Sequence, residues 1–431
     1  MQNFQAYRIS LTLVLLLAHA TGLSAANKIT KSKIEIEAPL STTEIQAIQS
    51  LQSWPHQEIT LSKSADDSTL QSLTKLDTVV DLTINFRNDQ ITSFAPLADL
   101  PHLAAFDARD AGFKKDTPFS LLPLAKCSKL QVLSLSNTTI KDASALVKCS
   151  RLTRLELTNS SVETLDFLSG TPRLQLLEIN SRDNSFDSYA PIGQLKWIEY
   201  LDVSTNPQAT DKALTPLAAL SSLRHLEVAY CTEITNLNFA RNNTFLEYMS
   251  AQSCSALDDL SGLKGLKYLD HLNIRATKVS SLSALEGTLF LRRLFISRTP
   301  IADLSPLAQC YSLEDIDAAG SQVDNLQVIG RLPQLTRLNI SRTPIESIES
   351  LPMTNKLSYL DISYTKVNDL TPLAKQRHLE TLLIIDIPSS DLSPLHSLPN
   401  LRELHLKKDF PQAEIDRLLS ANPLIEIRLR S

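Results

Sequence analysis

One pattern of apolar and polar positions recurs along most of the chain. The segments LQVLSLSNTTIKDASALVKCSRL (130–152), LRRLFISRTPIADLSPLAQCYSL (291–313) and LSYLDISYTKVNDLTPLAKQRHL (357–379) align without gaps on the pattern LxxLxLxxTxIxDLxPLAxxxxL. The second leucine of this pattern, or an apolar substitute, occurs fifteen times at steps of 22 to 27 residues, and the last six steps are all 22. These positions are Leu82, Phe106, Leu133, Leu155, Leu177, Leu201, Leu226, Met249, Leu272, Leu294, Ile316, Leu338, Leu360, Leu382 and Leu404. The chain is therefore predicted to be an array of stacked repeats.

Each repeat carries the signals for a short strand, a turn and a return segment. The two leucines of LxL face the core and the residue between them faces solvent, because strand side chains alternate. A Thr or Asn three residues after the second of these leucines, as at Thr343 and Asn206, can satisfy backbone groups where the chain turns. Ser305–Pro306 and Thr371–Pro372 then offer a capping hydroxyl and a proline at the first helical position. The pattern predicts an α/β solenoid curved like a horseshoe, with a parallel concave sheet and short helical or 3-10 segments on the convex side.

The composition agrees with such an array. Only 9 of the 431 residues are glycine, whereas 76 are leucine. Neither GxGxxG nor GxxxxGK occurs, which excludes the usual phosphate-binding loops of dinucleotide enzymes and NTPases. The formal net charge of −5 leaves no basic field for nucleic acid, and a hydrophobic content of 43% is enough for a substantial core. We expect a folded protein that does not bind nucleic acid.

These repeats resemble the internalin-like bacterial leucine-rich repeats, whose members share the 22-residue period. The resemblance covers residues 70–406 and implies a leucine-rich-repeat solenoid of about fifteen repeats. Threonine largely replaces the ladder asparagine that is usual in that family. No adhesive or wall-anchoring module follows the repeats, so a surface-bound role in invasion is not expected.

The N-terminus predicts export. Arg8 precedes an apolar run at 9–23, and the small residues at 24–26 follow it. This order is typical of a signal peptide cleaved near Ala25 or Ala26, and an uncleaved membrane anchor is the alternative. Nothing later in the sequence suggests a stable membrane span. We therefore expect a periplasmic or secreted protein.

The remaining segments complete the predicted domain organisation. Residues 1–26 are the signal peptide, 27–69 an N-terminal cap with a degenerate repeat, 70–406 the leucine-rich-repeat array, and 407–431 a C-terminal cap. The N-terminal cap contains a helical pattern at 41–52, and the tail at 411–430 predicts an amphipathic helix followed by a final strand. Two longer repeats, around 110–119 and 181–191, are predicted to form loops, either functional or merely tolerated.

The five cysteines raise the question of disulfides in an exported protein. Cys127, Cys149 and Cys310 occupy a leucine-like position of the repeat and are expected to be small buried apolar groups. Cys231 and Cys254 hold the turn position of adjacent repeats, where strands about 4.8 Å apart fall within the range that a disulfide tolerates. Parallel side-chain vectors make that geometry marginal, so a Cys231–Cys254 bridge is the less favoured alternative.

The strand positions that face away from the core give the main surface signal. Acidic residues recur between the two strand leucines, and aromatic, histidine and arginine side chains recur just before the first. Aromatic residues and arginine are enriched in interface hot spots. The expected ligand-binding residues on the concave face are Tyr200, Asp202, His225, Glu227, Tyr248, His271, Arg275, Arg293, Phe295, Asp315, Asp317, Arg337, Tyr359 and Asp361. The alternative is that these positions are simply the solvated polar face that any solenoid requires.

Candidate chemistry is sparse. His225 and His271 share one strand column two repeats apart, about 10 Å by strand spacing, which is too far for joint ligation of one metal ion. CxxC, HExxH and GxSxG do not occur. We expect no cofactor and no metal site.

These observations favour a non-enzymatic exported module that binds a protein or another macromolecule through the concave face. The alternative is a structural scaffold of the bacterial envelope that assembles through its convex side or its ends. Some bacterial leucine-rich-repeat proteins append a cysteine-dependent ubiquitin ligase domain, but no such extension occurs here, so an enzyme is not expected.

Overall fold

A computed structural model describes residues 28–29, 34–50, 57–76, 79–84, 90–109, 111, 113, 118–186, 188–352 and 356–430. The chain divides into two compact units, Met1–Gln208 and Ala209–Ser431, which we describe separately. The predicted signal peptide, residues 1–26, lies outside the described residues. No helix within the described ranges has the length and apolar character needed to cross a bilayer.

The first unit is built on a sheet whose strands run parallel after an antiparallel start. Strand β1 (Lys28–Ile29) pairs antiparallel with β2 (Ile34–Ile36), and β2 begins a parallel series. That series continues through β3 (Gln57–Leu61), β4 (Val79–Ile84), β5 (Ala105–Ala108), β7 (Val132–Ser136), β9 (Arg154–Thr158), β10 (Leu176–Glu178) and β11 (Tyr200–Asp202). Two short strands, β6 (Phe119–Ser120) and β8 (Ile140–Asp142), form a separate parallel pair.

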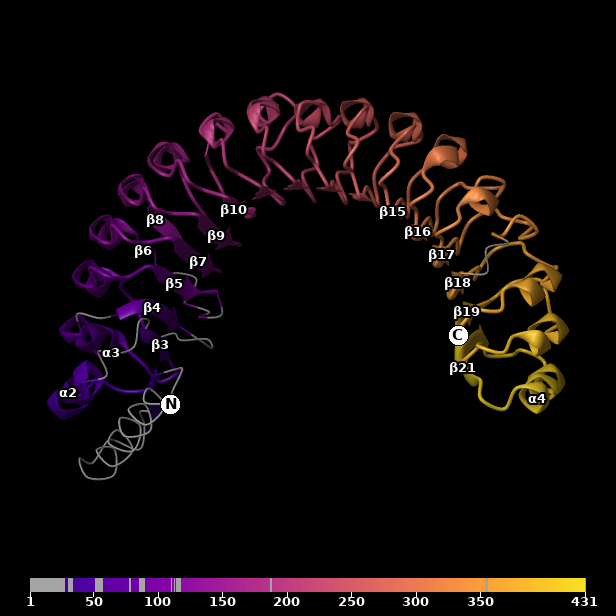
Figure 1. Cartoon of the computed structure of the whole chain (residues 1–431), viewed down its shortest axis with the longest axis horizontal. Coiled ribbons are helices and arrows are strands. Elements are labelled where there is room, and N and C mark those ends of the chain that lie inside the picture. Colours follow the sequence, from indigo (N-terminus) through magenta and orange to yellow (C-terminus); the bar gives the residue numbers. More distant parts are fainter. Residues whose placement is uncertain are drawn as a thin grey trace, which may run out of the picture. The chain divides into compact units, whose positions relative to one another are not determined.

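Helical segments connect these strands on the opposite side (Figure 1). They are α2 (Thr42–Ser50), α3 (Asp67–Ser72) and the 3-10 helices η1 (Leu73–Lys75), η2 (Ala95–Asp99), η3 (Leu122–Lys126), η4 (Ser144–Lys148), η5 (Asp166–Gly170) and η6 (Ile192–Gln194). Helix α2 falls inside the helical pattern predicted at 41–52.

The second unit repeats the same design with shorter strands. Its parallel strands are β12 (His225–Glu227), β13 (Tyr248–Ser250), β14 (His271–Asn273), β15 (Arg293–Phe295), β16 (Asp315–Asp317), β17 (Arg337–Asn339), β18 (Tyr359–Asp361), β19 (Thr381–Leu383), β20 (Glu403–Lys407) and β21 (Glu426–Arg430). Each pairs with the next in chain order, as Leu272 with Leu294 and Leu360 with Leu382 illustrate.

Short helices again cover the side of this unit that lies away from the strands (Figure 1). They are the 3-10 helices η7 (Thr215–Ala219), η8 (Asn238–Ala240), η9 (Ser261–Leu263), η10 (Ser283–Leu285), η11 (Ser305–Gln309), η12 (Ile329–Arg331), η13 (Thr371–Lys375) and η14 (Ser393–Ser397), followed by helix α4 (Gln412–Ala421). Helix α4 and strand β21 form where the tail pattern predicts a helix and a final strand.

The core follows the sequence period closely. All fifteen strand positions of the pattern, from Leu82 to Leu404, are completely buried. The apolar residue two positions later is buried as well, as at Ile274 and Ile340. Each repeat thus contributes a layer of side chains that only its neighbours can cover, which is why the repeats fold as a stack. The predicted solenoid with a parallel sheet and 3-10 segments is confirmed.

Threonine hydroxyls satisfy the backbone at the turn, as the pattern predicts. Thr277, Thr299, Thr343 and Thr365 each donate to the carbonyl oxygen three residues earlier, at 2.6 to 2.8 Å. All four are buried, so the carbonyl group that each one satisfies would otherwise lack a partner away from water. In the first unit Asn206 does the same work, because its amide donates to the carbonyls of Val203 and Ile179.

The predicted helix caps are wrong in one respect. Ser305 and Thr371 are the first residues of η11 and η13 rather than residues that precede them, and neither helix has a side-chain bond from its N-cap. The acceptor is the aspartate two residues earlier. Asp303 accepts from the Ser305 backbone N–H at 2.7 Å, and Asp369 accepts from that of Thr371 at 2.8 Å. The proline therefore occupies the second helical position, and the serine hydroxyl donates to Asp303 instead of capping.

The two long repeats use their extra residues partly to enlarge the core. Phe113 and Phe119 are buried and lie 4.6 Å apart between ring centroids, and Phe119 stacks on Phe94 at 4.3 Å. In the second long repeat Phe186 meets Tyr189 edge to face at 5.1 Å. The described parts of both segments thus contribute buried aromatic rings.

Candidate ligand-recognition face

The strand face of the second unit carries a continuous row of stacked rings. His225 on β12 stacks on Tyr248 of β13 at 3.9 Å between ring centroids with an interplanar angle of 5°. Tyr248 stacks in turn on His271 of β14 at 4.3 Å. His271 then meets Phe295 of β15 edge to face at 4.9 Å. The parallel register aligns His225, Tyr248 and His271 in one column, and Phe295 lies diagonally across from His271, in register with Asn273. Four successive repeats thus build one aromatic surface.

Arginines extend this row along the next repeats. The Arg275 guanidinium lies 4.2 Å from the centre of the Phe295 ring and reaches Asp317 on β16, with an Nη2–Oδ2 distance of 2.6 Å. Arg337 on β17 lies 4.2 Å from the centre of the Tyr359 ring, and its Nε is 3.7 Å from the Asp315 carboxylate. Cation–π contacts and ion pairs together hold these long side chains in place.

Burial and neighbouring charges shift several pKa values on this face. Burial, with a further contribution from Arg293 and other nearby cations, lowers the pKa of His271 to about 4, so this imidazole is neutral near pH 7. Burial raises the pKa of the Asp361 carboxyl, although bonds from Ser363 oppose the shift. Burial likewise raises the pKa of Asp315, against the attraction of Arg337.

The structure brings together most of the predicted site residues but not all of them. Twelve of the fourteen, from His225 to Asp361, lie on strands β12–β18 or directly after β14 in the second unit. Tyr200 and Asp202 belong to β11 of the first unit. There, the Asp202 carboxylate accepts a hydrogen bond from the Ser204 backbone N–H at 2.8 Å and another from the Asn180 amide. Asp202 thus stabilises the turn that follows β11.

The expectation that every residue between the strand leucines faces open solvent is wrong. Asp202 and Asp361 are buried, at 7% and 9% exposure, and Glu156 of the first unit is buried at 2%. Adjacent parallel strands place equivalent side chains within contact distance, so each one screens the next. Serine hydroxyls and arginine then bind the buried carboxylates: Glu156 accepts from Ser134 at 2.5 Å and from Arg154.

The first unit presents a more acidic strand face. Burial raises the pKa of Glu178, with the neighbouring carboxylates of Glu156 and Asp202 adding to the shift. Thr158 donates to Glu178 at 3.0 Å and opposes that shift. Arg109 pairs with Asp107 at 2.7 Å.

Sequence reasoning missed two of the arginines that follow the strands. Arg298 and Arg342 sit in the turns after β15 and β17, both with a positive φ of 57°. With Tyr230, Gln252 and others they line a hollow beside the ring row. The repeated tripeptide Ser-Arg-Thr at 297–299 and 341–343 was the available signal, because it places both arginines at the same turn position.

The alternative of a Cys231–Cys254 disulfide is wrong. Neither cysteine takes part in a disulfide, and both are buried. The Cys254 thiol donates to the Val228 carbonyl oxygen at 3.1 Å, and burial raises its pKa to about 12. Both thiols thus bond to backbone carbonyl groups, and the acceptor of the Cys254 thiol lies three residues before Cys231 in the neighbouring repeat. Cys127, Cys149 and Cys310 are buried free thiols, as the leucine-like position predicts.

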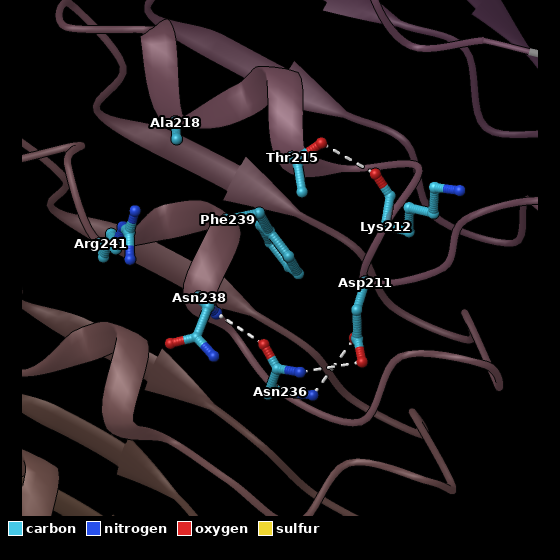
Figure 2. Close-up of a pocket in the computed structure, with 8 residues that line it drawn as sticks. All are labelled: Asp211, Lys212, Thr215, Ala218, Asn236, Asn238, Phe239 and Arg241. Atoms are coloured by element: carbon cyan, nitrogen blue, oxygen red, sulfur yellow. Dashed lines mark hydrogen bonds between the residues drawn. The ribbon is translucent and has the colours of Figure 1, made fainter.

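A second hollow lies on the helical side of the second unit, beside η7 and η8 (Figure 2). Its floor is the buried ring of Phe239, and Asp211 and Asn236 line its rim. Asp211 accepts from the Asn236 amide at 2.9 Å and from the Thr235 backbone N–H at 2.9 Å, while Asn236 accepts from the backbone N–H of Asn238. Because these polar groups bond to one another, we interpret them as contacts that hold two neighbouring loops together and not as a ligand site.

In the part of the chain that the structure describes, no group of three or more histidine, cysteine, aspartate or glutamate side chains is placed to hold a metal ion. His225 instead bonds to Glu227, with an Nε2–Oε1 distance of 2.8 Å. His405 on β20 makes the equivalent bond to Glu403 at 2.7 Å.

Comparisons with known proteins agree with this architecture. The family described as leucine-rich repeats (2 copies) matches residues 128–170. A comparison with curated proteins gives no match. Internalin InlF of Listeria monocytogenes is similar in structure, with a TM-score of 0.60, 19% identity, and coverage of 85% of this chain and 94% of that one.

Two further solved structures are similar. A leucine-rich-repeat protein of Leptospira interrogans gives a TM-score of 0.67 with 17% identity over 90% of this chain and 92% of that one. The functional domain of InlJ from Listeria monocytogenes gives 0.57 with 17% identity over 78% and 74%. At these identities the likeness concerns the fold, and it confirms an internalin-like leucine-rich-repeat solenoid.

Proposed function

We propose that this chain is a non-enzymatic binding protein that recognises a protein partner through the strand face of its second unit. The observation that carries the proposal is the continuous row from His225 through Tyr248, His271 and Phe295 to Arg275. Aromatic and arginine side chains of this kind dominate the binding energy of protein interfaces.

The row is also held rigid before any partner arrives. Rings stack on rings, and the arginines are fixed by a ring on one side and a carboxylate on the other, as Arg275 is between Phe295 and Asp317. A preorganised surface loses little side-chain entropy on binding. Several titratable groups of the face pair with one another, as His225 does with Glu227 and Arg275 with Asp317, which suits a contact surface better than a catalytic centre.

The proposal predicts that partner capture depends on aromatic side chains of this face. The combined variant Tyr248→Ala, Phe295→Ala and Tyr359→Ala should lose a crosslinked partner that the unchanged protein captures from the native envelope fraction. Loss of hot-spot rings weakens interfaces by about 2 kcal/mol or more each, so capture should fall by at least about a hundredfold. Circular dichroism and thermal unfolding check that the variant is folded.

A matched control uses three aromatic rings of the same unit that lie off this face. Phe245, Tyr268 and Phe290 each precede a strand by three residues and are about half exposed. Their combined change to alanine should leave capture intact. If the strand-face variant captures the partner as well as the unchanged protein does, the proposed function is wrong.

The same off-face rings favour a second candidate function, a scaffold that assembles through another side. Phe245 and Tyr268 stack at 5.8 Å, and Tyr268 and Phe290 at 6.2 Å, in a row open to solvent. Exposed apolar patches often mark association sites. A scaffold predicts self-association that increases with concentration in light scattering, disappears with the off-face triple variant, and ignores the strand-face variant.

Export completes the proposal and rests on the predicted signal peptide at 1–26. N-terminal sequencing of the mature protein should begin directly after Ala25 or Ala26. A mature protein that still begins at Met1 in the membrane fraction would instead support the uncleaved anchor.

A further inference from the structure

The hollow beside the ring row has the composition of an anion site. It has a volume of about 460 Å³ and lies where the strands β12–β17 end. Three arginines line it: Arg275 after β14, Arg298 after β15 and Arg342 after β17. Asp317 is the one acid among its lining residues. Three positive charges and one negative charge leave a net charge of +2, on a chain whose total is −5.

The hollow exists because small residues occupy the positions between the arginines. Gly320 has a φ of 66°, but Arg298 and Arg342 adopt nearly the same φ at the equivalent turns, so the backbone alone does not require glycine there. A Cβ at position 320 would contact only Arg298 Cγ, at 3.8 Å, so this position borders open space that a longer side chain would fill. Ala276 and Ala319 leave further room along the same rim.

The charges of the three arginines are unequally compensated. Arg275 is neutralised by Asp317, with bonds from both Nε and Nη2. Within the described parts of the chain no carboxylate pairs with Arg298 or Arg342. Arg342 lies 4.0 Å from the centre of the Tyr364 ring, which positions its guanidinium without satisfying its charge. Arg298 is exposed at the edge of the hollow.

We propose that this hollow binds a carboxylate of the protein partner, held between the guanidinium groups of Arg298 and Arg342. The proposal rests on the proposed function and adds the chemistry that the partner must present. A guanidinium offers a planar fork of donors that matches the two oxygens of a carboxylate, and such charge-assisted pairs are stronger than neutral hydrogen bonds. The carboxylate comes from an acidic side chain or from the free C-terminus of the partner.

The probes are three short peptides added to the full-length protein with selectively labelled arginine side chains. Ac-GGEGG-NH2 presents an acidic side chain, Ac-GGGGG-OH presents a free C-terminus, and Ac-GGQGG-NH2 presents neither. The Nε–H signals of Arg298 and Arg342 should shift with one or both acidic peptides, in the millimolar range and less at high salt. They should not shift with the neutral peptide. Which acidic peptide binds more tightly identifies the source of the carboxylate.

Two variants test the site itself. Arg298→Gln with Arg342→Gln removes the donors, and Gly320→Asn fills the space with a residue that tolerates a positive φ. Each should weaken peptide binding by about tenfold or more. The matched controls are Arg331→Gln with Arg377→Gln, two exposed arginines elsewhere in the same unit, and Gly265→Asn, where φ is 83° and no atom lies within 4 Å. Both controls should bind like the unchanged protein.

The outcomes separate this inference from the proposed function. If neither acidic peptide shifts the two arginine signals, or if inorganic phosphate does so and the peptides do not, the carboxylate site is wrong. The proposed function would still stand as long as the strand-face triple variant loses its partner. If the acidic peptides bind but the strand-face triple variant still captures the partner, the hollow binds a carboxylate and the proposed function is wrong.

Discussion

At the scale of single residues, the ring row makes the second unit sensitive to acid. Its central member, His271, has a folded-state pKa of about 4 because burial and nearby cations such as Arg293 disfavour the imidazolium. The unfolded value is about 6.5. Between these values the unfolded chain binds a proton that the folded chain does not, so stability falls as the pH drops from about 6.5 to 4 and is retained above that window.

His271→Phe should therefore flatten the dependence of stability on pH. The phenyl ring keeps the stack with Tyr248 but does not titrate, so the loss of melting temperature between pH 7.5 and pH 5 should be smaller than in the unchanged protein. His378→Phe, at an exposed position, serves as the control and should behave like the unchanged protein. Equal losses of melting temperature in His271→Phe and the unchanged protein would show that this histidine does not couple protonation to folding.

At the scale of the elements, an aspartate two residues before η11 and η13 accepts the first backbone N–H of each helix. Asp303→Ala removes the acceptor of the Ser305 backbone N–H, whereas Ser305→Ala leaves that bond in place. By analogy with helix caps we expect Asp303→Ala to lower the free energy of unfolding by about 1 kcal/mol and Ser305→Ala to lower it by less. Urea unfolding of both variants measures which one is the less stable. If Ser305→Ala lowers the free energy of unfolding more than Asp303→Ala does, the serine is the cap, as the sequence suggested.

The same bond has a pH dependence of known sign. Bonds from the Ser305 side chain and backbone lower the pKa of Asp303. A lowered carboxyl pKa stabilises the fold above the unfolded value near 3.8, and that contribution disappears as the pH falls through the folded value. The difference between Asp303→Ala and the unchanged protein should thus shrink below about pH 4.

The repeat elements were predictable because each depends on its own 22 residues. Local spacing predicts the buried strand leucines, the turn threonine at position 343 and the 3-10 helix that follows Asp303. The site was less predictable because its contacts join different repeats. Arg275 and Asp317 are 42 positions apart, and their pairing requires the observed strand register. The burial of Asp361 likewise depends on its neighbours across the sheet, which alternation along one strand does not report.

At the scale of the whole array, the terminal repeats have a neighbour on one side only, so another element must cover their apolar side chains. In the second unit α4 provides that cover, with Ile415 and Leu418 buried against the last repeat. Strand β21 pairs with β20 over five residues, and its charged side chains, Glu426, Arg428 and Arg430, discourage further strand pairing at the edge. The stability of a repeat array is a sum of terms between neighbours, so damage at an end should fade with distance from it.

Leu418→Asp tests this directly, because it places a charge at a fully buried position of the cover. Burying an unpaired polar group and losing the leucine should destabilise the terminal repeat by about 3 kcal/mol or more. Amide hydrogen exchange should then accelerate most in β20 and β21, less in β18, and not measurably in β12. Leu424→Asp, at 70% exposure in the adjoining loop, is the matched control and should leave exchange unchanged. Uniform acceleration from β12 to β21 would mean that the second unit unfolds as one block, and the nearest-neighbour description of its stability would not hold.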